Sequence, residues 1–140
     1  MKSYLFIERN RPIESESILI IKKSLFSLLK IYAKESTLVQ LKNKNPDILK
    51  ITFLNRESNN RISTIELELL SDRINILDIE INPNRTGLGT IVIKEIIRIA
   101  KELKLKKVYG KNVIGKHSGR LLGGLGFVQE ENDLYVLNLD

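Results

Sequence analysis

All eight glycines of this 140-residue chain lie between Gly87 and Gly126. Two of them fall in the run Ile81-Asn-Pro-Asn-Arg-Thr-Gly-Leu-Gly-Thr90, between an alternating apolar pattern and a helical one. A glycine-bearing turn at a helix N-terminus directs bare backbone N–H groups at one point, where the helix dipole adds partial positive charge. The sequence therefore predicts a strand–turn–helix unit that binds the phosphate of a ligand at residues 85–90.

Length and composition limit the class of protein. With 140 residues, 42% of them hydrophobic, the chain is expected to fold as a single domain over 1–140. Because it has no cysteine and one histidine, disulfide scaffolds and thiol nucleophiles are excluded and no metal site is expected. Glu8 and Arg9 end the N-terminal apolar stretch early, so we expect neither a signal peptide nor a membrane span, and predict a cytoplasmic protein.

Positive charge is concentrated around the glycine turn. The chain carries a net charge of +6, yet the stretch 85–120 has ten Lys/Arg and two acids, a net charge of +8. The positive electrostatic potential of such a stretch suits a polyanionic ligand. The alternative is that many of these lysines form a solvated helix face.

Apolar periodicity predicts a mixture of strands and helices. Short connections between the central strands predict antiparallel hairpins, whereas a strand, a helix and a further strand of this length predict a parallel crossover. The expected elements are strand 3–9, helix 14–35, turn 43–46, strands 48–55, 61–70 and 74–82, helix 88–103, strand 107–112, a short helix 117–125, and a hairpin of 126–129 with 134–139.

Three of these elements have a predicted inner and outer face. Helix 14–35 is expected to bury one apolar side and to leave Lys22, Lys23 and Lys30 outside. Helix 88–103 has Val92, Ile96, Ile99 and Leu103 on one side and Lys94, Arg98 and Lys101 on the other. In strand 74–82, the apolar residues Leu77, Ile79 and Ile81 alternate with the polar residues Asp78, Glu80 and Asn82.

The later half of the chain carries a recognisable set of motifs. Ile81-Asn-Pro83 is a Val-x-Pro-like step, Asn84-Arg-Thr-Gly87-Leu-Gly89 is a Gln/Arg-x-x-Gly-x-Gly-like turn, and Gly126-Phe127 follows about forty residues later. With this order of elements, the chain resembles the GNAT family of acyl-CoA-dependent N-acyltransferases, best over residues 76–139. The resemblance implies an α/β fold with a central mixed, mostly antiparallel sheet flanked by helices.

The resemblance also implies acetyl-CoA as acyl donor. Backbone N–H groups of residues 85–90 would hold the pyrophosphate, and the strand before the turn would hydrogen-bond the pantetheine arm after splaying from strand 108–111. The main-chain N–H near Ile79 would polarise the thioester carbonyl. The implied cofactor-binding residues are Ile79, Ile81, Asn84, Arg85, Thr86, Gly87, Leu88, Gly89, Thr90, Asn112 and Ser118.

Acyl transfer to an amine needs a base and an acid. Either Glu80 or Asp78 is a candidate base, and His117, Tyr109 and Tyr135 are candidate donors to the departing thiolate. The sequence departs from the family pattern in three places. Asn84 replaces Gln or Arg, Gly115 stands where the family has Asn, and Leu122 stands where it has Tyr.

Three functions remain open at this stage. The first is an N-acetyltransferase acting on a small amine or a protein amino group, which, like its relatives, could be a homodimer. The second is a non-catalytic CoA-binding or interaction module. The third, a nucleic-acid-binding domain, is disfavoured because no recognition helix or aromatic stacking platform is evident. Acids at 78, 80, 130, 131 and 133 could attract a cationic acceptor.

Overall fold

The computed structural model of the protein describes residues 4–8, 16–32, 37–45, 47–55, 57–58, 61–80, 88–113 and 115–139. In β1 (Tyr4–Glu8) and at residues 17, 37, 45, 55, 61–63, 78–80, 88, 115 and 116, only the backbone is described. The turn predicted to bind phosphate, residues 81–87, lies outside these ranges.

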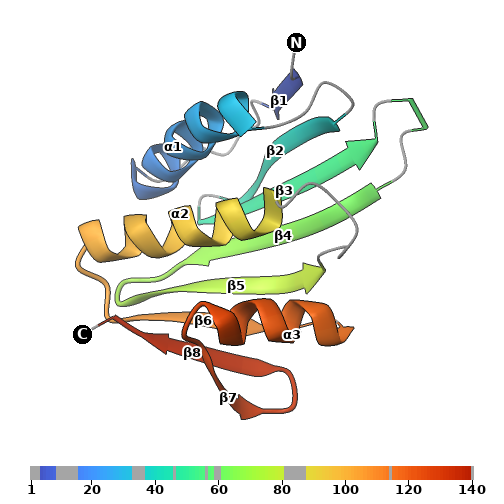
Figure 1. The fold of residues 1–140 in the computed structure, drawn as a ribbon. Helices are drawn as coiled ribbons and strands as arrows, with labels where there is room; N and C mark the ends of the chain where they lie inside the picture. Colours follow the sequence, from blue (N-terminus) through green and yellow to red (C-terminus); the bar gives the residue numbers. More distant parts are fainter. Residues whose placement is uncertain are drawn as a thin grey trace.

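One sheet organises the described chain (Figure 1). Its strand order is β1-β2-β3-β4-β5-β6-β8-β7; the β1–β2 and β5–β6 pairs are parallel, and the other pairs are antiparallel. The predicted mixed, mostly antiparallel sheet flanked by helices is therefore confirmed. The remaining elements are α1 (Glu16–Tyr32), β2 (Thr37–Asn45), β3 (Ile48–Asn55), β4 (Arg61–Leu69), β5 (Arg73–Glu80), α2 (Leu88–Glu102), β6 (Lys107–Lys111), α3 (Gly115–Gly124), β7 (Val128–Glu131) and β8 (Leu134–Asn138).

Strand β2 was missed by the sequence analysis. The prediction of a turn over 43–46 is wrong, because Asn43 to Asn45 belong to β2 and pair with the start of β3. The physical reason is tertiary: Asn43 to Asn45 have low strand propensity, but their pairing with β3 holds them in the sheet. The other elements lie within a few residues of their predicted positions.

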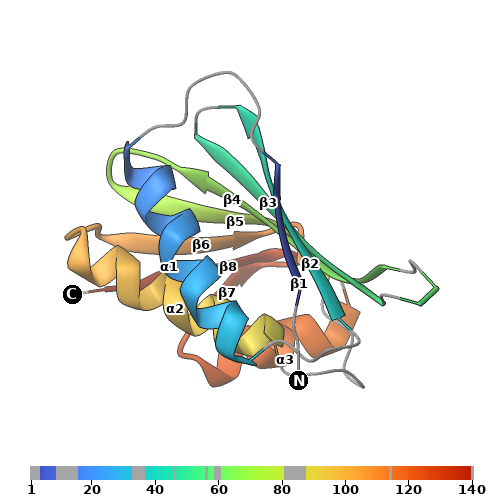
Figure 2. The same ribbon diagram turned by 90° about the horizontal axis from the view of Figure 1, so that it is seen from above.

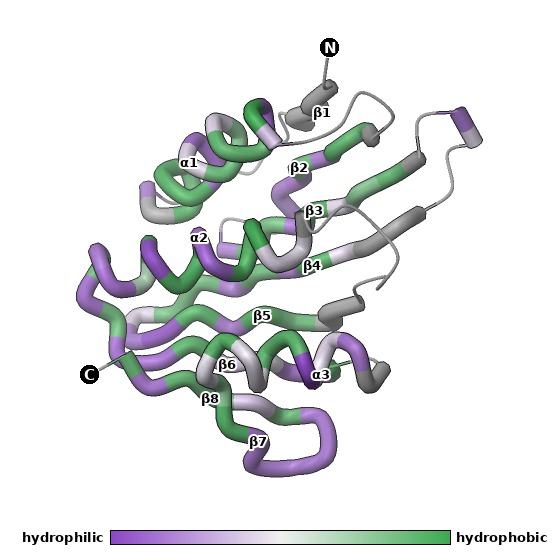
Figure 3. Tube along the Cα trace, in the orientation of Figure 1, coloured by the Kyte–Doolittle hydropathy of each residue, from purple (hydrophilic) through white to green (hydrophobic). Residues whose placement is uncertain are grey.

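The three helices of the described chain lie over the same face of the sheet, as Figures 1 and 2 together show. Every second residue of the central strands points at them and joins one connected apolar cluster, in which Ile51, Leu67 and Ile76 are fully buried. Helix α2 contributes Val92, Ile96 and Ile99, and polar residues alternate with apolar ones along both α1 and α2 (Figure 3). The predicted faces of α2 are confirmed.

The predicted outer face of α1 is wrong at one residue. Lys22 is only 4% exposed, and its Nζ donates a 2.7 Å hydrogen bond to Oδ1 of the equally buried Asn43 on β2. Lys22 is four residues after Ile18 and three before Leu25, so it lies on the buried side of the helix. Its polar partner is on the strand that the sequence analysis missed, so no local pattern indicated that Lys22 would be buried.

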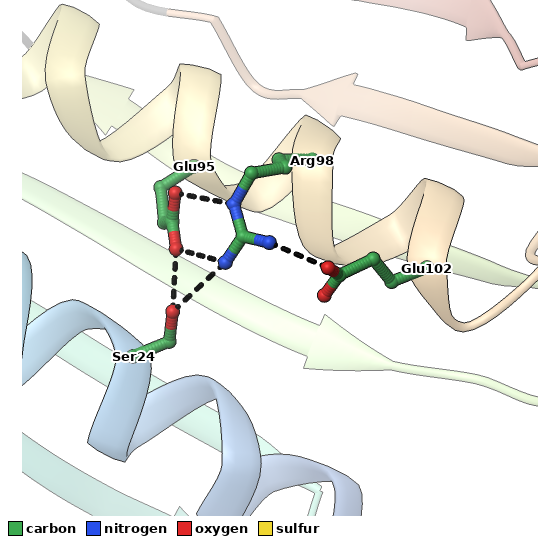
Figure 4. Close-up of polar contacts among 4 residues, drawn as sticks. All are labelled: Ser24, Glu95, Arg98 and Glu102. Carbon is green, nitrogen blue, oxygen red and sulfur yellow. Dashed lines mark hydrogen bonds and ion pairs between the residues drawn. The ribbon is translucent and has the colours of Figure 1, made fainter.

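A polar bridge joins α1 to α2 at the surface (Figure 4). The Arg98 guanidinium donates to both carboxylate oxygens of Glu95, at 2.9 and 2.5 Å, and to Glu102 at 2.7 Å. The hydroxyl of Ser24 on α1 donates to Glu95 and accepts from Arg98. The hydrogen bond from Arg98 lowers the pKa of the Glu95 carboxyl, and the same contact raises the pKa of Arg98. The charge of Arg98 is thus largely neutralised.

Candidate functional site

The topology brings four segment ends to one edge of the sheet. Because β5 and β6 are parallel, their C-terminal ends lie at the same edge. Helix α2 follows β5 and helix α3 follows β6, so the N-termini of both helices begin near that edge (Figure 1). In open α/β sheets, ligands bind in crevices at the carboxyl ends of strands. This edge is the candidate site.

Strand β5 is irregular where it enters the site. Thr64 pairs with Glu80 and Glu66 pairs with Leu77, so three steps along β5 match two steps along β4. This is a β-bulge, and it interrupts the two-residue alternation that the sequence predicted for 74–82. The side chains of Asp78 and Glu80 lie outside the described part of the structure, so their sharing of one face stays a prediction.

The pairing between strands β5 and β6 also ends at this point. Their pairing runs from Arg73↔Lys107 to Leu77↔Lys111, and within the described part of β6 it goes no further. Backbone groups of residues 78–80 on that side have no ladder partner in β6, although Glu80 still pairs with Thr64 on β4. An edge of this kind can accept an extended ligand as an added strand.

Helix α2 begins directly after the predicted turn. Its backbone starts at Leu88, Gly89 is buried, and Thr90 is half-buried. No acid lies in its first turn, so nothing there opposes an anion. The other predicted members of the turn fall outside the described residues: Ile81, Asn84, Arg85, Thr86 and Gly87.

On the other side of the site, β6 ends in a left-handed residue. Asn112 has φ +53°, a conformation that Asn tolerates better than most residues. The N–H of Val113 then donates a 3.3 Å hydrogen bond to the carbonyl of Asp133 in the β7–β8 turn. These features direct the chain into α3, where His117 is exposed and Ser118 is buried. Asn112 thus has a structural role at the end of β6, and its role in cofactor binding stays a prediction.

The structure separates the candidate proton donors. Tyr109 follows the buried Val108 and lies on the sheet face away from the helices, among Arg73, Lys107 and Lys111. Tyr135 lies under α3; a Cβ added to Gly119 would come within 2.5 Å of its hydroxyl oxygen. His117 is exposed in the first turn of α3, the helix that begins at the shared edge.

Leu122, at the position of the family's tyrosine, is fully buried in the apolar core. The side chain there packs the helix onto the sheet. The sequence analysis did not foresee the β5 bulge or the contact between Tyr135 and Gly119, because both depend on cross-strand register and no local motif signals either one.

Other features of the described chain lie elsewhere. A pocket of about 550 Å³ is lined by Leu69, Leu70, Leu103 and Leu105 among others, at the opposite edge of the sheet, where α2 ends. Among the residues with described positions, no group of three or more His, Asp or Glu side chains could hold a metal ion. No helix in the described ranges is long and apolar enough to span a membrane.

Comparison with known proteins identifies the fold. Neither a protein-family model nor a curated protein matches the chain. Solved structures do: the ribosomal-protein-S18-alanine N-acetyltransferase of Escherichia coli is 13% identical, with 67% of this chain and 70% of that chain covered and a TM-score of 0.50. A GNAT-family protein from Desulfovibrio desulfuricans is 12% identical (68% and 71% covered, TM-score 0.50). Nourseothricin acetyltransferase is 11% identical (68% and 67% covered, TM-score 0.50). The chain has the fold of GNAT acetyltransferases.

Proposed function

We propose that this protein is an N-acetyltransferase that moves an acetyl group from acetyl-CoA to a primary amine. The observation that carries the proposal is that the pairing of β5 with β6 ends at Leu77. This end lies beside a β-bulge in β5, and helix α2 follows it in the chain. An extended thioester arm would add to the free edge of β5, and its pyrophosphate would meet the N–H groups of the turn before α2. The shared fold with GNAT acetyltransferases supports this assignment.

The cofactor contacts follow the order of the chain. Gly87 and Gly89 let the backbone approach the pyrophosphate, Arg85 adds a charge-assisted contact, and Asn84, Thr86, Leu88 and Thr90 complete the turn. Ile79 and Ile81 supply main-chain groups to the pantetheine, with Asn112 and Ser118 on the α3 side. The N–H near Ile79 stabilises the oxyanion that forms at the thioester carbonyl.

The chemistry is a direct transfer. The amine nitrogen attacks the thioester carbon, the C–N bond forms as the C–S bond breaks, and CoA leaves as a thiolate. Glu80, or Asp78 through a water, takes the proton that the amine loses. His117 returns a proton to the thiolate sulfur, in place of the tyrosine that Leu122 replaces. No metal takes part in this scheme.

The acceptor would be a cationic amine, carried by a small molecule or by a protein. Strand β7 is exposed along its whole length, and Glu130, Glu131 and Asp133 are exposed around its turn. These acids would raise the local concentration of a protonated amine. Glu131→Gln is then expected to raise the KM for the acceptor while leaving the KM for acetyl-CoA unchanged.

Amine-dependent release of free CoA thiol tests the proposal. Purified protein is mixed with acetyl-CoA and a panel of polyamines, amino sugars and peptides, and the thiol is measured with a chromogenic disulfide. Glu80→Gln is expected to lower kcat by about 100-fold or more. Release that is independent of the amine, or equal in the variant and the wild type, would contradict this mechanism.

A CoA-binding module without catalysis is the second candidate. One observation favours it: the buried Leu122 has no proton to give. Binding of acetyl-CoA without turnover on any amine would support this reading.

A further inference from the structure

The sheet face opposite the helices carries a compact basic group around one aromatic ring. We call it the Tyr109 cluster; it consists of Arg73 on β5 and Lys107, Tyr109 and Lys111 on β6. The guanidinium carbon of Arg73 lies 5.2 Å from the centre of the Tyr109 ring, and the ammonium nitrogens of Lys107 and Lys111 each lie 5.9 Å from it. These distances place three cations within cation–π range of one ring.

The sheet register explains why they converge. Lys107 and Lys111 are two residues before and after Tyr109, so all three side chains project from the same face of β6. Arg73 pairs with Lys107 across the parallel strands. The sequence offers no sign of this, because 34 positions of chain separate Arg73 from Lys107.

The positive charge of the cluster is poorly compensated. Asp72 is 3.6 Å from Arg73, but both side chains are substantially exposed, so this ion pair is weak. The nearby Glu68 accepts from Asn75 at 3.0 Å, and Glu66 pairs with Lys44 at 3.1 Å. Lys107 and Lys111 have no acidic partner in the part of the chain that the structure describes. An anion placed between them would relieve their mutual repulsion.

Arg73 is free to turn toward such an anion. Its Nε is buried and has no hydrogen-bond partner among the described residues, and neither has Oδ1 of the neighbouring buried Asn75. Among the described residues, the ring contact and the weak pair with Asp72 are the contacts that hold the guanidinium. Reorientation toward a ligand oxygen would therefore cost little and would give Nε a partner.

Positive side chains continue across the same face. Register partners run from Lys111 through Leu77 and Glu66 to Lys50 and Lys42, so these five residues lie side by side across five strands. In this row Glu66 is paired with Lys44, and the remaining charged side chains are all lysines. Neighbouring strands are about 4.8 Å apart, so the row suits an extended polymer rather than one small anion. No described helix covers it (Figures 1 and 2).

We propose that the Tyr109 cluster binds single-stranded nucleic acid. Lys107, Lys111 and Arg73 neutralise backbone phosphates while a base stacks against the Tyr109 ring, the combination that sequence-tolerant single-strand sites use. An acidic peptide would need the cations but not the ring, so the central tyrosine favours a nucleic acid. The sequence analysis disfavoured nucleic acid because the aromatic residues are scattered along the chain; the fold gathers one of them with three cations. The proposal does not depend on the proposed acetyl transfer, which is assigned to the edge where β5 ends and α2 begins.

Fluorescence anisotropy with fluorescein-labelled oligo(U) tests the proposal. Lys107→Glu/Lys111→Glu is expected to weaken binding at least about tenfold and to lower the slope of log affinity against log salt by at least about 1. The matched control is Lys94→Glu/Lys101→Glu, which makes the same charge change on the exposed side of α2 and is expected to change affinity less than about threefold.

Two further comparisons separate nucleic acid from an acidic polypeptide. Tyr109→Phe keeps a stacking ring and is expected to bind oligo(U) like the wild type, whereas Tyr109→Leu is expected to lose about tenfold. Equal loss in both lysine double variants, or full binding by Tyr109→Leu with displacement by poly-glutamate, would overturn the proposal. Acetyl-CoA titration of the same variants is expected to be unchanged, so failure here is distinguishable from failure of the proposed transferase activity.

Discussion

The ammonium nitrogen of Lys22 on α1 donates a 2.7 Å hydrogen bond to Oδ1 of Asn43 on β2, and both residues are 4% exposed. A buried cation is costly unless polar groups replace its water. The pair therefore fixes α1 over β2, the strand that continues the sheet toward β1. The amide nitrogen of Asn43 has no partner among the described groups, so the acceptor oxygen is what this side chain contributes.

Asn43→Leu is expected to destabilise the protein more than Lys22→Met. The first variant removes one acceptor from a buried cation and lowers the free energy of unfolding by about 2 kcal/mol. The second variant removes the charge and leaves the neutral amide of Asn43 without its donor, which lowers the free energy of unfolding by about 1 kcal/mol. The double variant is expected to lose less than Asn43→Leu alone, as measured by urea unfolding. Strictly additive losses would show that the two side chains do not depend on each other.

Much of the fold was predictable because local pattern and tertiary structure agree. Helix α2 presents Val92, Ile96 and Ile99 to the core as its periodicity requires, and β3 has its predicted bounds. The hairpin connections and the parallel β5–β6 crossover followed from connection lengths. The end of β2 was mistaken for a turn because Asn43 to Asn45 are held in the sheet by pairing with β3 and not by their own propensity.

The location of the candidate site could be predicted from the sequence, but its geometry could not. The strand–turn–helix order located the edge where β5 ends and α2 begins. The bulge opposite Thr64 and Glu66 depends on how β4 and β5 align, which no single segment encodes. The residues 81–87, with Arg85 and Gly87, lie outside the described ranges, so their role stays a prediction, as does the single-domain organisation.

The bridge between α1 and α2 is expected to be acid-sensitive. Arg98 lowers the pKa of Glu95 below its ordinary value of 4.5, so the folded state favours the charged carboxylate. The stability that this contributes is present above about pH 4.5 and is lost as pH falls through the lowered pKa. Glu95→Gln is expected to cost about 1 kcal/mol at about pH 7, and the difference from wild type should shrink below about pH 4. A difference that stays constant across this range in urea unfolding would contradict the assignment.

Two glycines of α3 are expected to respond oppositely to alanine. A Cβ on Gly123 meets nothing within 4 Å, so Gly123→Ala should raise the free energy of unfolding by about 0.5 kcal/mol through helix propensity. A Cβ on Gly119 would be 2.5 Å from the Tyr135 hydroxyl oxygen, so Gly119→Ala should lower it. Adding Tyr135→Phe should restore part of the loss, since the nearest remaining ring atom is at 3.2 Å. Thermal unfolding that ranks the two alanine variants equally would rule out this contact.

The most direct measurement of the central claim is calorimetric titration with acetyl-CoA. The wild type is expected to bind with a dissociation constant on the order of micromolar, and both Gly87→Glu and Gly89→Glu should abolish binding by placing a carboxylate where the pyrophosphate would sit. Gly124→Glu is the matched control, because that glycine is exposed and a Cβ there meets nothing within 4 Å. A thermal melt of each variant checks that it folds. Absence of binding by the wild type, or binding by the turn variants as tight as that of Gly124→Glu, would contradict an acetyl-CoA site at the start of α2.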